Sequence, residues 1–88
     1  MNEITKTRKL YAIYDRKRQA YLAVMEKNNN AVALRDFEMI VNAKDGMIKH
    51  YPEDYKLSYL GYMDEEKGTL VSELADICEA KEVLKNEQ

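Results

Sequence analysis

Two runs of apolar and aromatic residues, separated by a short basic segment, constrain the fold of this chain most. Residues 9–25 read KLYAIYD, RKR and QAYLAVM in succession. Aromatic and β-branched residues favour strands, and a few polar residues between two such runs indicate a β-hairpin. Successive strand residues alternate sides, so pairing Asp15 with Arg18 across the turn places Tyr14 and Tyr21 on one face. The residues expected on the core face are Tyr11, Ile13, Ala20, Leu22 and Val24.

A helix is expected after this hairpin. Asn30 is the expected N-cap, because its side chain can accept a hydrogen bond from a free amide of the first turn. The next residues read AVALRDFEMIVNAK and bring their apolar members to helical spacing. These are Ala33, Phe37, Ile40 and Val41. The helix should cover the hairpin and end near Lys44, before Asp45 and Gly46, since glycine favours the left-handed geometry of helix ends.

The rest of the chain predicts a second hairpin and a final helix. Residues 55–63, YKLSYLGYM, read as a strand that ends in the polar turn of residues 64–68. The return strand is expected to be short, from Thr69 to Val71, and Ser72 can cap a final amphipathic helix. The apolar residues of that helix are Leu74, Ile77, Cys78 and Leu84. The expected fold is α+β, of ββαββα order, with an antiparallel sheet packed against the central helix and a C-terminal helix.

The length of the chain indicates one domain. Eighty-eight residues are too few for two domains, so we expect a single domain over residues 1–88, with flexible tails at 1–8 and 85–88. A core of this size only roughly balances the entropy of ordering, which makes a homodimer the default expectation. The only cysteine, Cys78, cannot form an internal disulfide, and this favours a reducing compartment. No apolar run approaches the roughly 18 residues that cross a bilayer, so no membrane association is expected.

The sequence offers little for catalysis or for a cofactor. The single histidine, His50, reads as a polar loop residue beside Pro52, because a catalytic site needs several convergent groups. No CxxC or HxxxH spacing supports a zinc site, and the scattered glycines form no phosphate-binding loop. We therefore expect a protein that is not an enzyme and has no catalytic residues, no metal and no cofactor.

Charge and tyrosines suggest a nucleic-acid partner. Residues 1–27 carry seven Lys or Arg against three acids, whereas residues 64–88 carry eight acids against three bases. Tyrosine rings can stack on unpaired bases while cations follow the phosphates. The candidate DNA-binding residues lie on and around the first hairpin: Lys9, Tyr14, Arg16, Lys17, Arg18, Tyr21 and Lys27. From this pattern alone, a tyrosine-rich sheet with a solvated basic edge accounts for the same residues equally well.

Three short segments carry a family resemblance. YAIYD at 11–15, HYPEDY at 50–55 and LGYMD at 60–64 are similar to the nonstructural DNA-binding protein of gokushovirus-like microviruses, the small single-stranded DNA phages. The PEDY run with its following glycine and aspartate is the specific part. This chain departs from the family pattern at Tyr51, which separates His50 from Pro52, and at Met63, which replaces an aromatic residue. The resemblance implies a viral non-capsid protein of the host bacterial cytoplasm that binds DNA and assists the change from duplex replication to single-strand production and packaging, without catalysis.

Two hypotheses follow from the sequence. The first is single-stranded DNA binding by a viral nonstructural protein. The alternative is a protein–protein interaction module that acts on a host or viral protein without contacting DNA. Cations that converge on one face would favour the first hypothesis, and cations interleaved with the acids of residues 64–88 would favour the second.

Overall fold

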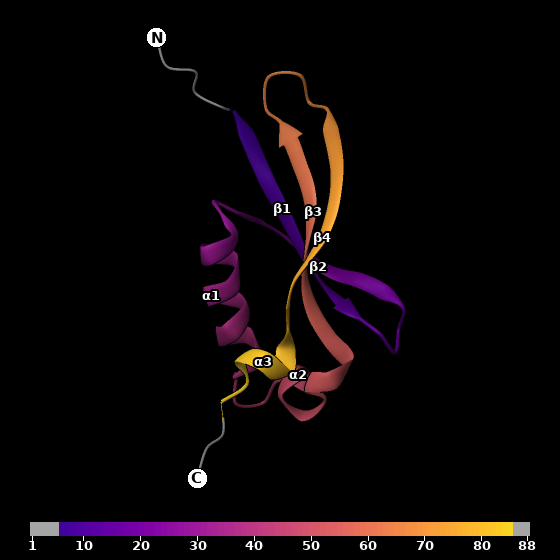
Figure 1. Cartoon of the computed structure of the whole chain (residues 1–88), viewed down its shortest axis with the longest axis vertical. Helices are drawn as coiled ribbons and strands as arrows, with labels where there is room; N and C mark the ends of the chain where they lie inside the picture. The colour runs from indigo at the N-terminus through magenta and orange to yellow at the C-terminus, as the bar shows by residue number, and fades with distance from the viewer. Residues whose placement is uncertain (1–5, 86–88) are drawn as a thin grey trace.

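The computed structural model describes residues 6–85 and shows a twisted antiparallel sheet with its helices on one side (Figure 1). In chain order the elements are β1 (Thr7–Asp15), β2 (Ala20–Lys27), α1 (Asn30–Val41), α2 (Met47–His50), the 3-10 helix η1 (Pro52–Asp54), β3 (Tyr55–Asp64), β4 (Leu70–Glu79) and α3 (Ala80–Val83). The strand order is β2-β1-β3-β4, so β2 and β4 are the edges of the sheet. The expected α+β fold and its ββαββα order are confirmed. Of the expected tails, residues 1–5 and 86–88 lie outside the described residues, while Thr7 and Arg8 belong to β1.

The turn of the first hairpin is longer than predicted. Asp15 pairs with Ala20, and the expected pairing with Arg18 is wrong. The Asp15 carboxylate accepts hydrogen bonds from the backbone N–H groups of Lys17 (3.0 Å) and Arg18 (3.3 Å). Gln19 then reverses the chain with a φ of 58° and donates its N–H to the Asp15 carbonyl (2.7 Å). An aspartate that binds its own turn in this way stabilises a longer loop than strand alternation can reveal.

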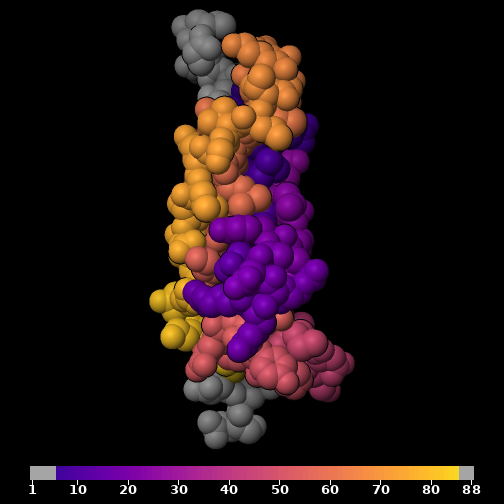
Figure 2. Space-filling view, turned by 90° about the vertical axis from the view of Figure 1, so that its right-hand side faces the viewer, coloured from indigo at the N-terminus to yellow at the C-terminus, as the bar shows by residue number. Residues whose placement is uncertain are grey.

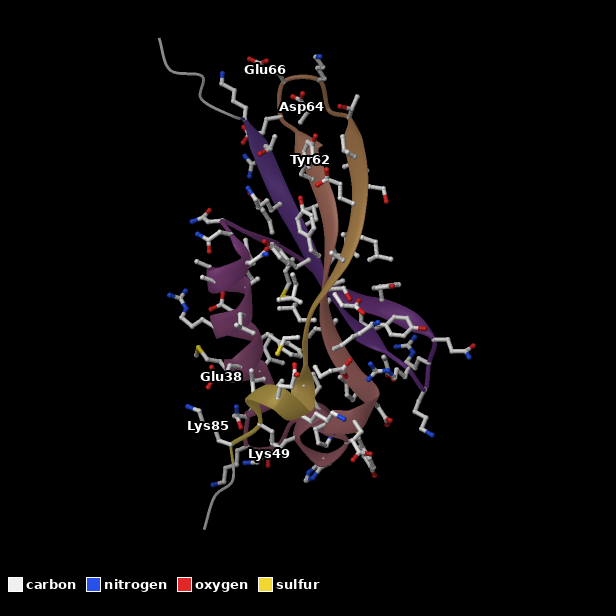
Figure 3. The ribbon with its side chains drawn as sticks, viewed as in Figure 1. Glu38, Lys49, Tyr62, Asp64, Glu66 and Lys85 are labelled. Carbon is white, nitrogen blue, oxygen red and sulfur yellow. The ribbon has the colours of Figure 1, made fainter. Side chains whose placement is uncertain are left out.

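The turn of the second hairpin is built in the same way. The Asp64 carboxylate accepts from the backbone N–H groups of Glu66 (2.9 Å) and Lys67 (3.2 Å), at the tip of the β3–β4 hairpin (Figure 3). Gly68, with a φ of 72°, occupies the position that Gln19 holds in the first turn. Glycine adopts this left-handed geometry at no steric cost, whereas glutamine adopts it only with a steric cost.

A β-bulge changes the faces of β2. Tyr11 and Ile13 are buried as expected, but Val24 is 63% exposed, so its prediction as a core residue is wrong. The reason is Ala23, whose φ of 54° inserts an extra residue into the strand and places Met25 opposite Tyr11.

Helix α1 begins one residue earlier than the predicted cap. Asn29 is the N-cap, and its side chain accepts a hydrogen bond from the Val32 N–H (2.9 Å). The expected cap, Asn30, is the first helical residue, and its side chain accepts a hydrogen bond from the Tyr11 hydroxyl (2.6 Å). This bond ties the start of α1 to the centre of β1.

The face that α1 buries largely agrees with the predicted one. Ala33, Phe37 and Val41 are buried, but Ile40 is 37% exposed, so its assignment to the core is wrong. The helix ends at Val41, three residues before the expected Lys44, where the Asn42 N–H caps the last turn.

The predicted C-terminal helix is mostly a strand. Ser72 does not cap a helix; it lies within β4, which pairs with β3, and helical structure is confined to α3. A return strand that ended at Val71 would leave most of the β3 edge without backbone hydrogen-bond partners, which is costly for a strand beside the core. Cys78 therefore lies opposite Leu57 on β3.

The core lies between the sheet and the helices. Its fully buried large side chains include Tyr11, Phe37, Val41 and Leu57. The view from the side opposite α1 shows the β1–β2 hairpin and β4 at the surface (Figure 2). One face of the sheet is thus free to carry a site.

Candidate nucleic-acid interface

The seven candidate DNA-binding residues do not form one cluster. They fall into three groups: the ring pair Tyr14 and Tyr21, the turn residues Arg16, Lys17 and Arg18, and the strand-end residues Lys9 and Lys27. Lys9 is about 20 Å along β1 from the turn, at roughly 3.3 Å per residue. Lys27 points toward α1, since its Nζ lies 2.8 Å from the Asp36 carboxylate. The structure therefore brings five of the seven to one end of the hairpin and leaves Lys9 and Lys27 apart from them.

The two tyrosine rings contact each other across β1 and β2. The centroids of Tyr14 and Tyr21 are 4.6 Å apart and the rings are tilted by 50°. Lys56 of β3 lies opposite Tyr14, with its Nζ 5.3 Å from the centroid of that ring. Tyr14 is thus flanked on both sides, whereas Tyr21 is 41% exposed at the edge. Tyr21 is the ring of this pair that can accept a stacked base.

Lys56 is a member of this site that the sequence reasoning missed. Its ammonium lies 3.0 Å from the Asp76 carboxylate, which also accepts a hydrogen bond from the Ser58 hydroxyl (3.3 Å). The hydrogen bond from Lys56 lowers the pKa of Asp76 below its ordinary value. Placing Lys56 beside Tyr14 requires the β1–β3 pairing, which joins distant segments and has no local sequence signal.

Arg16 is engaged by an acid of β4. Its Nη2 lies 2.6 Å from the Glu79 carboxylate, and its Nη1 donates to the Glu53 carbonyl (2.8 Å). The hydrogen bond lowers the pKa of Glu79 and raises that of Arg16. Both side chains are about a third exposed (39% and 31%), and an ion pair of this kind contributes about 1 kcal/mol or less. A phosphate can therefore compete with Glu79 for this guanidinium.

The other two turn cations are open to solvent. Among residues 6–85, neither Lys17 nor Arg18 forms an ion pair, and both are exposed. Lys17 borders a surface hollow of about 310 Å³ that Met47, Tyr51 and Tyr55 line together with the acids Asp15 and Asp54. The hairpin end thus carries the exposed Tyr21 ring and two exposed cations that form no ion pair among the described residues. On the open face they are followed by the pairs Arg16–Glu79 and Lys56–Asp76. The cations of the open face are partly interleaved with acids of β4.

The groups suited to other chemistry are dispersed. Within the part of the chain that the structure describes, no three histidine, cysteine or acidic side chains are placed to hold a metal ion. His50 lies on α2 with its ring edge toward Tyr51. Burial and the neighbouring Glu82 carboxylate raise the pKa of Cys78 to about 11, which leaves its thiol protonated and a poor nucleophile at neutral pH.

Comparisons with known proteins place this small α+β protein, a four-stranded antiparallel sheet with helices on one face, in a phage family. The chain belongs to the family described as Phage ORF5 protein, which matches residues 8–83. It is also similar to "Protein ORF5" of Chlamydia phage 1, with 37% identity over 62 residues. That alignment covers 66% of this chain and 65% of the relative, so the chain spans slightly less than two thirds of the length of the curated relative. No solved structure matches the chain.

The family confirms the phage resemblance noted in the sequence. As to membranes, none of the helices within residues 6–85 has both the length and the apolar character needed to span a bilayer.

Proposed function

We propose that this chain is a nonstructural phage protein that binds single-stranded DNA through the end of its first hairpin. The observation that carries the proposal is the exposed Tyr21 ring at the same end of the hairpin as Lys17 and Arg18, two exposed cations that form no ion pair among residues 6–85. A base stacked on such a ring gains about 1–3 kcal/mol, and the adjacent cations follow the phosphates. In a phage protein, this activity fits genome replication and packaging in the host bacterial cytoplasm. The proposed activity is binding and involves no catalysis, metal or cofactor.

The size of the site predicts weak, salt-sensitive binding. Lys17, Arg18 and a released Arg16 would supply two to three phosphate contacts. For single strands, log K falls by about 0.7 per contact for each tenfold rise in salt, so affinity should fall roughly 7- to 20-fold between about 50 and 200 mM salt. Binding of a fluorescent oligothymidylate, measured by anisotropy at both salt concentrations with a duplex competitor, tests this expectation.

Matched variants locate the site. Tyr21→Ala should weaken binding about 5- to 150-fold, the equivalent of one lost stacking contact. Tyr62→Ala, which removes a ring at the other end of the sheet, opposite Lys9, should leave affinity unchanged. A double Lys17→Ala, Arg18→Ala variant should bind more weakly with a shallower salt dependence. Absence of binding at about 50 mM salt, or equal losses in the Tyr21 and Tyr62 variants, would refute the proposal.

A specific observation favours the second function, a protein-interaction module. Arg16 and Lys56 are matched by Glu79 and Asp76, so much of the open face has mixed charge. A polyanion gains little from such a surface, whereas a protein surface of similar mixed charge can be accommodated on it. Retention of a host or viral protein by variants that do not bind DNA would support this alternative.

A further inference from the structure

Strand β4 forms an outer edge of the sheet, and its first residues are apolar. Among residues 6–85, no strand pairs with the outer side of β4, and residues 70–76 are all exposed. The pairing of β4 with β3 is regular from Leu70 to Ser72, and the register shifts after Ser72. Bulges and charged residues discourage strand pairing, so the regular run from Leu70 to Ser72 is the part of the edge that another strand can join.

An apolar hollow of about 260 Å³ lies beside this run. Its lining includes apolar side chains from three adjacent strands: Leu10 of β1, Leu60 and Tyr62 of β3, and Leu70 and Val71 of β4. Leu70 is 71% exposed and Val71 is 36% exposed. An apolar side chain of a strand paired with β4 would lie next to this hollow and would remove apolar surface from water there.

Acids flank the apolar run on both sides. Residues 64–79 carry six acids against one base, Lys67. Before the run, at the tip of the β3–β4 hairpin, the side chain of Glu66 is 67% exposed. After the run, Glu73 is exposed and accepts a hydrogen bond from the Tyr59 hydroxyl (3.3 Å), but it forms no ion pair among residues 6–85. Negative charge therefore brackets the part of the edge that is open to pairing.

Ion pairs within the sheet leave these acids able to bind further cations. The Glu66 carboxylate lies 3.6 Å from the Lys6 ammonium, and the Asp76 carboxylate, 61% exposed, lies 3.0 Å from the Lys56 ammonium. A carboxylate has about four acceptor sites on its oxygens, so one bonded cation does not saturate it. A lysine or arginine on an incoming strand would thus meet acceptors before and after the apolar run.

We propose that the edge of β4 from Leu70 to Ser72 binds an extended segment of another protein, in which a short apolar run is flanked by lysine or arginine residues. The segment adds a strand to the sheet, and its apolar side chains cover the hollow. Charge favours this occupant over a second copy, because β4 carries acids and no base. The edge lies at the opposite end of the sheet from the turn of the first hairpin (Figure 1), so this proposal and the DNA proposal can each fail without the other.

The proposal is tested by fluorescence anisotropy with synthetic peptides and the full chain. The probe is a fluorescein-labelled peptide with three lysines on either side of a valine–threonine–valine core. It should bind with a Kd of about 100 μM or tighter, as expected of a small interface, and more weakly as salt rises. A peptide with glutamates in place of the lysines should not bind. A third peptide with proline at its centre keeps every charge but lacks one backbone N–H, and should bind at least about 5-fold more weakly.

Two matched lysine variants locate the site on the chain. Leu70→Lys places a like charge in the apolar run and should weaken binding of the lysine peptide about 2- to 30-fold. Val24→Lys makes the same change at a 63% exposed position of β2, the other edge of the sheet, and should leave binding unchanged. A lysine peptide that does not bind, a proline peptide that binds as tightly, or equal losses in the two variants would overturn the proposal.

Discussion

Replacing Gly61 with alanine should disrupt the contact between β3 and β4. Gly61 has a φ of 132°, a backbone region that is almost restricted to glycine. An added Cβ would lie 1.9 Å from the Val71 carbonyl oxygen and 2.9 Å from the Glu73 nitrogen. Ordinary contact begins at 3.4 Å, so β4 would have to move by about 1.5 Å at Val71.

Two costs add in this variant. A non-glycine residue at such a φ costs about 1–3 kcal/mol. The displacement of β4 would break or weaken one or two strand hydrogen bonds, at about 0.5–1.5 kcal/mol each. The expected loss is therefore about 2–6 kcal/mol, a large part of the roughly 4–13 kcal/mol that a domain of this length can have.

Gly68→Ala is the matched control. Gly68 also has a positive φ, of 72°, but an added Cβ would meet nothing within 4 Å. The free energy of unfolding of the Gly68→Ala variant should therefore fall only by the cost of a positive φ at a non-glycine residue, about 1 kcal/mol. Urea unfolding followed by circular dichroism gives both values, and the melting temperature of the Gly61 variant should fall by about 10 °C or more. If the two variants lost the same stability within about 0.5 kcal/mol, β3 and β4 would not approach each other at Gly61 as described.

Three further predictions follow from individual side chains. Gln19→Gly should raise the free energy of unfolding by up to about 1 kcal/mol in urea titrations, because glycine adopts the left-handed geometry without strain; a loss of stability would contradict this. Cys78 should react slowly with iodoacetamide at pH 8, and Glu82→Gln should accelerate the reaction by lowering the pKa of the thiol from about 11; equal rates in the two proteins would contradict this. Lys56 lowers the folded-state pKa of Asp76. The contribution of this carboxylate to folding stability is therefore fully present above the unfolded-state pKa, near 4, and is lost as the pH falls through the folded-state pKa. The stability difference between the native protein and Asp76→Asn should therefore shrink from pH 6 to pH 2, from at most about 1 kcal/mol since Asp76 is 61% exposed.

Local patterns predicted the parts of the fold that depend on local physics. The alternation around Tyr11 and Ile13 and the helical spacing of Phe37 and Val41 both identified core residues correctly, because a buried face imposes its period on the sequence. The observed ends of helices and strands differ by a few residues from the predicted ones where a side chain hydrogen-bonds to the backbone. Asn29 rather than its neighbour caps α1, and the Asp15 carboxylate extends the first turn.

Features that depend on distant segments were missed. The residues of β4 have apolar positions that also suit an amphipathic helix, and only the need of β3 for a second partner decides in favour of a strand. In the candidate site, the end of the hairpin with Tyr21, Lys17 and Arg18 was predictable from the sequence. The contact of Lys56 with Tyr14 and the pairing of Arg16 with Glu79 depend on strand neighbours that the sequence does not order.

The central position of β1 has a consequence for the order of events during synthesis. Asp15 pairs with Tyr55 and Thr7 pairs with Asp64, so the partners of this strand are 40 to 57 positions apart. Contacts between distant segments carry a loop-closure cost before they contribute stability, which slows folding. A nascent chain that ends before Tyr55 has a partner for only one side of β1. We therefore expect the core to form late in translation, once β3 has left the ribosome.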